Sequence, residues 1–250
     1  MLILNTENEA VIPRNWYIST SPTLYYQLTI INNRSYTIYY KITSQTTGIT
    51  LNNNTGSIGS ASAGIVMLKI TFLSIPSSQD YTVNLNVELY SDSAYENLID
   101  SGSFDLTVHF IDLNTANKIA YWNFSDGSKQ GWVADGVSNT AFADPYSIYK
   151  CTTTYGGCYI SFSSPSITLP SSGNIWLIFA YNGGGTSSIS ISFGSTNIKN
   201  IKNIWLSGGQ WYIFAIKVNQ GLGTTNNFNF NICISAPACG FLDNVYIVSL

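Results

Sequence analysis

The sequence has few charged residues. They make up 9% of its 250 residues, against about 25% in an ordinary soluble domain. So little charge, beside 45% hydrophobic and 14% aromatic residues, excludes a disordered tail, a coiled coil and the usual surface of a cytosolic enzyme. The formal net charge is −3, with only ten Lys and Arg residues. Because a phosphate backbone needs a basic patch, nucleic acid is excluded as a partner.

Long apolar runs and leader features are also missing. The longest runs, at 176–181 and 211–216, are far shorter than the roughly 20 residues that span a bilayer, so we expect no transmembrane helix. The first five residues lack the basic segment and the apolar core of a signal peptide. We expect that a leader was removed or never used.

Catalytic motifs are equally scarce. The one histidine, His109, lies between Val108 and Phe110, where we expect a solvated polar strand residue. There is no Gly-x-Ser-x-Gly, HExxH or phosphate-binding loop. The second half offers a glycosidase only four acids, which are Asp126, Asp135, Asp144 and Asp243. The sequence therefore predicts a protein that is not an enzyme.

The sequence is rich in the residues of β-sheets, namely Ile, Val, Tyr and Phe, and in the turn residues Ser, Thr and Asn. Residues 81–90 alternate between apolar and polar side chains without a fault, which predicts a half-buried strand. The same period appears at 24–30, 66–72 and 106–110, and no stretch keeps a helical period. Such strands need a second sheet to cover their apolar face, so the fold class is all-β, with tandem antiparallel β-sandwiches.

The charges divide the chain into two parts. Residues 1–114 hold nine acids and four bases, whereas residues 115–250 hold four acids and six bases. This asymmetry predicts two modules. Residues 1–112, with a tyrosine-rich early strand and a closing strand at 104–110, resemble the immunoglobulin-like sandwiches of microbial surface proteins. Residues 113–118 are predicted to be a short linker.

Residues 119–250 contain four short motifs in a particular order. An aromatic residue and an acidic turn precede Gly131-Trp132, a Ser-Pro-x-Ile-x-Leu strand covers 164–169, and Gly209-Gln-Trp211 comes before the closing Leu242-Asp243-Asn244-Val245. This order resembles the galactose-binding-like and MAM-like jelly rolls, which include many carbohydrate-binding modules. The resemblance implies structural positions for Trp122, Trp132 and Trp211.

The same resemblance implies a structural Ca²⁺ between the first and last strands. Asp126 and Asp243 match the two positions that supply its carboxylates. Ser125 departs from the pattern, because it stands where the family commonly has the first acid. If no ion binds, we expect Asp126 to cap its turn and Asp243 to bond nearby backbone.

All the cysteines lie in the second half, at Cys151, Cys158, Cys233 and Cys239. Their spacing favours two local disulfides, Cys151–Cys158 and Cys233–Cys239. Core thiols and a zinc site remain alternatives, although gaps of seven and six residues do not fit the short gaps of zinc knuckles. Disulfides indicate an oxidising compartment, a cell or virion surface, or the cytosol of a hyperthermophile.

Aromatic rings that are not needed in the core are candidates for stacking on sugars. With Trp16 in the first module, the candidates are Trp205, Trp176, Tyr181 and Tyr155, and Trp205 is favoured because a turn-rich segment surrounds it. Three sequons, at Asn33, Asn53 and Asn123, are candidate glycosylation sites.

The whole chain resembles the turret, spike and capsid-decoration proteins of viruses that infect hyperthermophilic archaea, and the surface proteins of their hosts. This resemblance implies a non-enzymatic surface protein, at the virion or the cell surface, that assembles with other structural subunits or itself and meets a host glycan. The alternative is a secreted carbohydrate-binding protein or an accessory module of a glycoside hydrolase.

Overall fold

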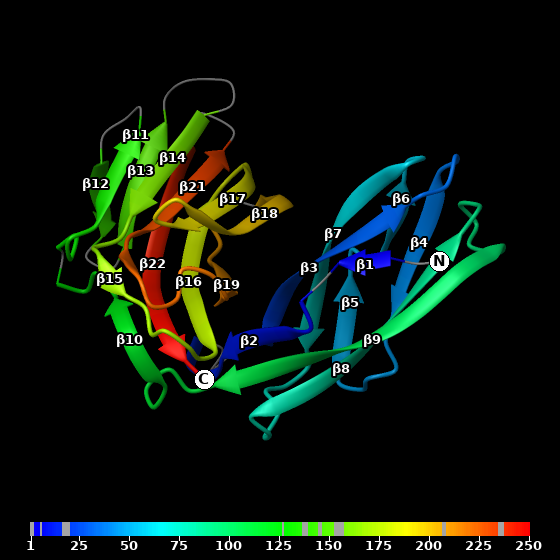
Figure 1. Ribbon diagram of the computed structural model, residues 1–250, viewed down its shortest axis with the longest axis horizontal. Coiled ribbons are helices and arrows are strands. Elements are labelled where there is room, and N and C mark those ends of the chain that lie inside the picture. Colours follow the sequence, from blue (N-terminus) through cyan, green and yellow to red (C-terminus); the bar gives the residue numbers. More distant parts are fainter. Residues whose placement is uncertain are drawn as a thin grey trace. The chain divides into compact units, whose positions relative to one another are not determined.

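The computed structural model describes residues 3–5, 7–16, 21–126, 128–136, 140–144, 147–152, 158–206, 209–234 and 238–250. The chain divides into two compact units, Met1–Thr115 and Ala116–Leu250. The boundary falls within the segment 113–118 that the sequence predicts as a linker. Each unit is made of β-sheets. Figure 1 shows the strands, coloured from blue at the N-terminus to red at the C-terminus.

The first unit has a four-stranded sheet with the order β1-β3-β7-β5 and a five-stranded sheet with the order β2-β9-β8-β4-β6. Its strands are β1 (Ile3–Asn5), β2 (Glu9–Pro13), β3 (Thr23–Asn32), β4 (Ile38–Thr43), β5 (Ile49–Asn52), β6 (Thr55–Ile58), β7 (Ser62–Phe72), β8 (Asp80–Tyr90) and β9 (Leu98–Ile111). A single turn of 3₁₀ helix, η1 (Arg14–Trp16), follows β2.

The start of the chain contributes to both sheets of the first unit. Strand β1 pairs antiparallel with β3, and β2 then pairs parallel with β9. In the lettering of the immunoglobulin fold, β1, β3, β7 and β5 are strands A, B, E and D, while β4, β8 and β9 are C, F and G. The immunoglobulin-like sandwich predicted from the sequence is confirmed.

The alternating pattern of the predicted strands produces the core of this sandwich. Along β8, Val83, Leu85 and Val87 are fully buried, and the residues between them are partly exposed. Phe72 of the four-stranded sheet meets Phe110 of the five-stranded sheet edge to face, with ring centroids 5.1 Å apart. The apolar faces of the two sheets therefore pack against each other.

The second unit has a larger sheet with the order β12-β13-β22-β16-β19, in which β10 also pairs with β22, and a five-stranded sheet with the order β11-β14-β21-β17-β18. The larger sheet contains β10 (Asn117–Trp122), β12 (Thr140–Asp144), β13 (Ser147–Thr152), β16 (Ile175–Gly183), β19 (Tyr212–Val218) and β22 (Ala238–Ser249). The five-stranded sheet contains β11 (Val133–Gly136), β14 (Cys158–Ser163), β17 (Thr186–Phe193), β18 (Thr196–Leu206) and β21 (Phe228–Ile234), and β15 (Ile167–Thr168) pairs with β20 (Thr225–Asn226).

Aromatic side chains fill the space between these two sheets. Phe179 of β16 contacts Phe230 of β21 edge to face at 5.0 Å, and Trp132 packs on Phe230 at 5.8 Å. Trp122 meets Trp132 at 5.3 Å. Trp122 and Trp132 are both buried, as the resemblance implies. The fold is thus all-β, with two sandwiches in tandem whose described strand pairs are antiparallel except for β2 with β9.

Among the described residues, the one helix is the single turn η1. Within the described ranges, no helix is long and apolar enough to cross a membrane.

Candidate functional site

Two of the four aromatic residues proposed from the sequence as sugar contacts are buried. Trp176 is 1% exposed and Tyr181 is 0% exposed, so the prediction that their rings stack on a ligand is wrong. The two side chains lie on opposite faces of β16, because Tyr181 is two residues from Phe179, which contacts the opposite sheet, and Trp176 is three residues from it. The Tyr181 hydroxyl bonds to Thr186 Oγ1 at 2.9 Å, and any side chain at Gly183 would clash with that hydroxyl.

The other two candidates lie partly or wholly outside the described residues. Tyr155 belongs to the undescribed segment 153–157, and of Trp205 only the backbone, in β18, is described. Trp211, which the sequence assigns to a structural position, is 47% exposed. That prediction is wrong, because Trp211 precedes β19, in which inward side chains begin with Tyr212.

The packing of Phe179 shows which face of the larger sheet points away from the core. Since Phe179 contacts the opposite sheet, its neighbours Ile178 and Ala180 point outward, and so does Asn182. Directly paired residues share a face. Tyr246 pairs with Ile178, Asp243 with Ala180, and Phe241 with Asn182. Tyr246, Asp243 and Phe241 therefore all lie on the outer face.

A β-bulge at Asn244 makes this arrangement possible. The register between β16 and β22 shifts between the pairs at Ile178 and Ala180, and Asn244 has a positive φ of 48°. Such a bulge adds one residue to a strand and changes which residues beyond it face outward.

Two pairs of stacked rings lie on this face. Tyr149 of β13 stacks with Phe241 at 5.3 Å with an angle of 24° between the rings, and Tyr121 of β10 stacks with Tyr246 at 4.0 Å and 23°. Tyr121 is 39% exposed, Tyr149 and Phe241 are partly exposed, and Tyr246 is 8% exposed. The accessible ring of the second pair is therefore that of Tyr121. Each pair joins directly opposed residues of adjacent strands.

Polar groups separate the two pairs. Asp243 accepts hydrogen bonds from the backbone N–H and the Nδ2 group of Asn244, both at 2.7 Å. The Tyr121 hydroxyl donates to Asn244 Oδ1 at 3.3 Å. Burial, a hydrogen bond with Tyr121 and the nearby charge of Asp243 raise the pKa of Tyr246. A hydrogen bond from Tyr121 to Asn244 therefore joins the Tyr121–Tyr246 pair to the bulge.

Trp211 extends the other ring pair across the sheet. The register of β16 and β19 ends at Tyr181 and Tyr212, so the next positions along both strands are Asn182 and Trp211. Asn182 also pairs with Phe241, and its Oδ1 accepts a hydrogen bond from the Gly209 N–H at 3.2 Å. This places Tyr149, Phe241, Asn182 and Trp211 in one row.

We define the aromatic face by the residues that these relationships bring together, which are Tyr121, Tyr149, Asn182, Trp211, Phe241, Asp243, Asn244 and Tyr246. Ring faces stack on apolar surfaces, and the carboxylate and amides bond hydroxyl groups. Sequence reasoning missed Tyr121, Tyr149, Phe241 and Tyr246. The available signal was Asp243-Asn244 inside a closing strand, because Asn tolerates the left-handed conformation of a bulge.

The two predicted calcium ligands have other roles among the described residues. Asp126 Oδ1 accepts the Ser128 N–H at 2.9 Å, and hydrogen bonds from Ser128 lower the pKa of Asp126. Asp243 bonds to Asn244, as described above. No group of three or more His, Cys, Asp or Glu residues gathers in the described part of the chain. Ca²⁺ takes six to eight oxygens, so these two residues do not fit a calcium ion and we assign none.

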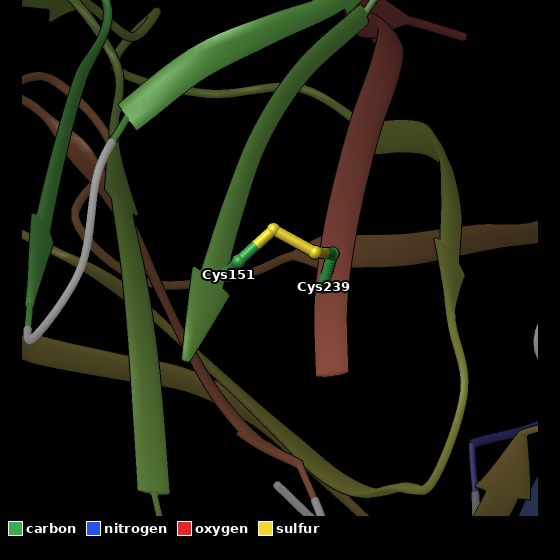
Figure 2. Close-up of a disulfide and its surroundings, with 2 residues drawn as sticks. All are labelled: Cys151 and Cys239. Atoms are coloured by element: carbon green, nitrogen blue, oxygen red, sulfur yellow. A yellow bond between two sulfur atoms is a disulfide. The ribbon is translucent and has the colours of Figure 1, made fainter. Parts of the chain in front are cut away.

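The predicted local disulfides are wrong. Cys151 of β13 is joined to Cys239 of β22, as Figure 2 shows. The two residues oppose each other in the register of these strands, with Cα atoms 3.9 Å apart. Cys233 lies in β21, partly buried, and pairs with Tyr159 and Ser188, while the side chain of Cys158 is outside the described set. Sheet pairing, not sequence spacing, selects the partners.

The candidate glycosylation sites differ in exposure. Asn33 and Asn53 are exposed outside the strands, and Asn53 has a positive φ of 58°. Asn123 is partly buried, and its Oδ1 accepts the Ser125 N–H at 3.2 Å and the Gln130 amide at 3.3 Å. Asn33 and Asn53 are therefore the more accessible of the three.

His109 lies on β9, and its Nδ1 is 2.8 Å from Asp80 Oδ1. This side chain is 16% exposed and is engaged with a neighbouring strand residue.

No protein-family model and no curated protein matches the sequence. Among solved structures, the chain is similar to a family-61 carbohydrate-binding module in complex with β-1,4-galactotriose, with 16% identity and a TM-score of 0.37, over 51% of this chain and 94% of that one. It is also similar to the K3 adhesin domain of Lys-gingipain from Porphyromonas gingivalis, with 14% identity and a TM-score of 0.40, over 54% and 99% of the two chains. A third is the C-terminal family-6 module of a laminarinase from Zobellia galactanivorans, with 18% identity and a TM-score of 0.36, over 47% and 91%.

Proposed function

We propose that the second unit binds carbohydrate on the aromatic face and that the protein is a non-enzymatic binding protein. One observation carries the proposal. The ring pairs Tyr149–Phe241 and Tyr121–Tyr246 lie on the same side of one sheet, with Asp243 and Asn244 between them. Aromatic rings next to hydroxyl-binding groups are the chemistry that recognises a sugar.

The separation of the ring pairs favours an oligosaccharide. Phe241 and Tyr246 are five residues apart, and one of these residues is taken up by the bulge. Four strand steps of about 3.3 Å give roughly 13 Å between the pairs. A ligand that contacts the Tyr149–Phe241 pair and the accessible ring of Tyr121 needs more than one sugar ring, and its middle part would meet Asp243 and Asn244.

Binding is favoured over hydrolysis by the distribution of acids. Glycosidases place two carboxyl groups on either side of the scissile bond. Among the described residues, Asp243 is the one carboxylate that we place on the aromatic face, and both of its oxygens already bond Asn244.

A surface or extracellular location suits such a protein, and the disulfide supports it, because disulfides persist mainly in oxidising environments. The more specific role expected from the sequence, in a virion turret or spike, stays a prediction. In that role the first unit would serve as a stalk and the aromatic face would meet a host glycan.

The test is binding of soluble hexasaccharides of glucose, mannose, xylose and galactose, measured by isothermal titration calorimetry. We expect at least one of them to bind and Tyr121→Ala to weaken that binding. Tyr36→Ala is the matched control, because Tyr36 is 41% exposed but lies in the first unit. If no sugar binds, and Tyr121→Ala instead abolishes self-association in sedimentation experiments, the face serves assembly and the proposal is wrong.

A further inference from the structure

The disulfide lies directly beside one half of the aromatic face. Cys151 and Tyr149 are two residues apart on β13, and Cys239 and Phe241 are two residues apart on β22. Since side chains alternate along a strand, residues two apart share a face. The disulfide and the Tyr149–Phe241 pair are therefore consecutive cross-strand pairs on the outer side of the same two strands.

Strand β13 is held by its pairing with β22, by its buried residues Ser147 and Ile148 at one end, and by the disulfide at the other. It pairs with β22 over five residue pairs, from Ile148–Leu242 to Thr152–Ala238. Its other neighbour is β12, the outermost strand of the sheet. Figure 2 shows the sulfur bridge spanning the gap between β13 and β22. The disulfide is therefore the covalent link between the β12–β13 hairpin and the centre of the sheet.

The two rings of the pair differ in what supports them. Phe241 lies on β22, which also pairs with β16 through Asn182, so its strand is held on both sides. Tyr149 lies on β13, where β22 is the only neighbour toward the centre of the sheet. Loss of the disulfide would therefore release Tyr149 and leave Phe241 in place. The Tyr121–Tyr246 pair would be unaffected, because it joins β10 to β22 at other positions.

We propose that the Cys151–Cys239 disulfide positions Tyr149 for carbohydrate binding, so that the affinity of the aromatic face depends on the oxidation state of this pair. The inference rests on the proposed function, because it concerns the same face. Reduction proceeds by thiol–disulfide exchange with a dithiol. The Sγ–Sγ bond accepts two electrons and two protons and becomes two thiols, while the dithiol closes into a cyclic disulfide.

The experiment combines the double variant Cys151→Ser/Cys239→Ser with ring substitutions, and calorimetry measures the affinity for the hexasaccharide that the unaltered protein binds. Removal of the disulfide is expected to weaken binding roughly tenfold, which is the upper range for one aromatic stacking contact. Tyr149→Ala should cause a similar loss in the oxidised protein and less than about twofold further loss in the serine background, because both changes remove the same contact.

Tyr121→Ala is the matched control, because its effect should be the same in both backgrounds. If Tyr149→Ala weakens binding equally with and without the disulfide, the positioning role is wrong. A general loss of structure would instead remove the effects of both ring substitutions together, and that result also overturns the proposal.

Hydrogen exchange of the full chain, with and without dithiothreitol, tests the inference without any sugar. We expect faster exchange of β13 amides after reduction and unchanged exchange in β10 and β16. Unchanged protection of β13 would overturn the inference even if sugar binds. Failure of the oxidised protein to bind any hexasaccharide, with β13 released by reduction, would overturn the proposed function, and of the inference it would leave only that the disulfide holds β13 in place.

Discussion

Phe241 and Tyr246 lie on the same face of β22, although they are five positions apart along the strand. In a regular strand they would point to opposite faces. The left-handed backbone of Asn244, with φ of 48°, inserts the extra residue that brings Tyr246 to the side of Phe241 and Asp243. One backbone conformation therefore sets the composition of the aromatic face.

The backbone at Asn244 should tolerate glycine better than alanine. The left-handed region costs an ordinary L-residue about 1 to 2 kcal/mol, whereas glycine enters it freely. Both substitutions remove the Asn244 side chain and its bond to Asp243, so their difference isolates the backbone. We expect Asn244→Ala to be less stable than Asn244→Gly by about 1 kcal/mol in urea unfolding. Equal stability of the two variants would contradict the left-handed backbone conformation of Asn244 in the bulge.

Trp211→Ala should weaken sugar binding with little loss of stability. Its ring is 47% exposed, and surface substitutions usually change the free energy of unfolding by less than about 0.5 kcal/mol. Phe179→Ala is the comparison, since Phe179 is fully buried and its loss should cost about 3 to 5 kcal/mol. Urea unfolding and calorimetry measure the two effects. A large loss of stability for Trp211→Ala would show instead that the Trp211 side chain is part of the core.

The disulfide should stabilise the second unit strongly, because its cysteines are 88 residues apart in sequence. A cross-link that closes a loop of this length lowers the entropy of the unfolded chain, which stabilises the fold by about 4.6 kcal/mol in the chain-entropy model, and native strain commonly reduces this gain. We expect Cys151→Ser/Cys239→Ser to lower the free energy of unfolding by roughly 2 to 4 kcal/mol, measured in urea. A loss below about 1 kcal/mol would show that the entropic account fails here.

Alkaline pH should destabilise the second unit through its buried tyrosines. Burial raises the pKa of Tyr181 and Tyr246 above 10.0. A group whose pKa is raised by folding contributes its full stability below the unfolded pKa, and this stability is lost as the pH rises above about 10. Tyr246→Phe removes one such group, so its thermal midpoint should fall less steeply above pH 10. Identical slopes for the two proteins would exclude Tyr246 as a source of the effect.

The fold was accessible from the sequence where strands are regular. Residues 81–90 alternate, and β8 buries every second residue from Val83 to Leu89 as expected. Strand β16 gives no such signal, because every residue from Ile175 to Tyr181 is apolar and buried. A continuous apolar run does not reveal which face a residue joins, so Trp176 and Tyr181 could not be separated from exposed rings.

The candidate site was largely inaccessible because it depends on pairing between distant strands. The alternation rule places Phe241 and Tyr246 on opposite faces, and only the register of β16 with β22 shows otherwise. The cysteines present the same difficulty. Cys151 and Cys158 are close in sequence, but the antiparallel pairing of β13 with β22 brings Cys151 to Cys239.

The central position of β22 constrains the order in which the protein can fold during synthesis. Residues 238–249 supply the strand that joins β10, β13 and β16, so the larger sheet of the second unit cannot form until they emerge from the ribosome. The first unit needs nothing beyond β9 for its two sheets. The first sandwich can therefore fold while the ribosome is still translating the second. Until β22 is synthesised, the apolar side chains of the other strands of this sheet remain exposed to solvent. The nascent chain is therefore most prone to aggregation during this interval.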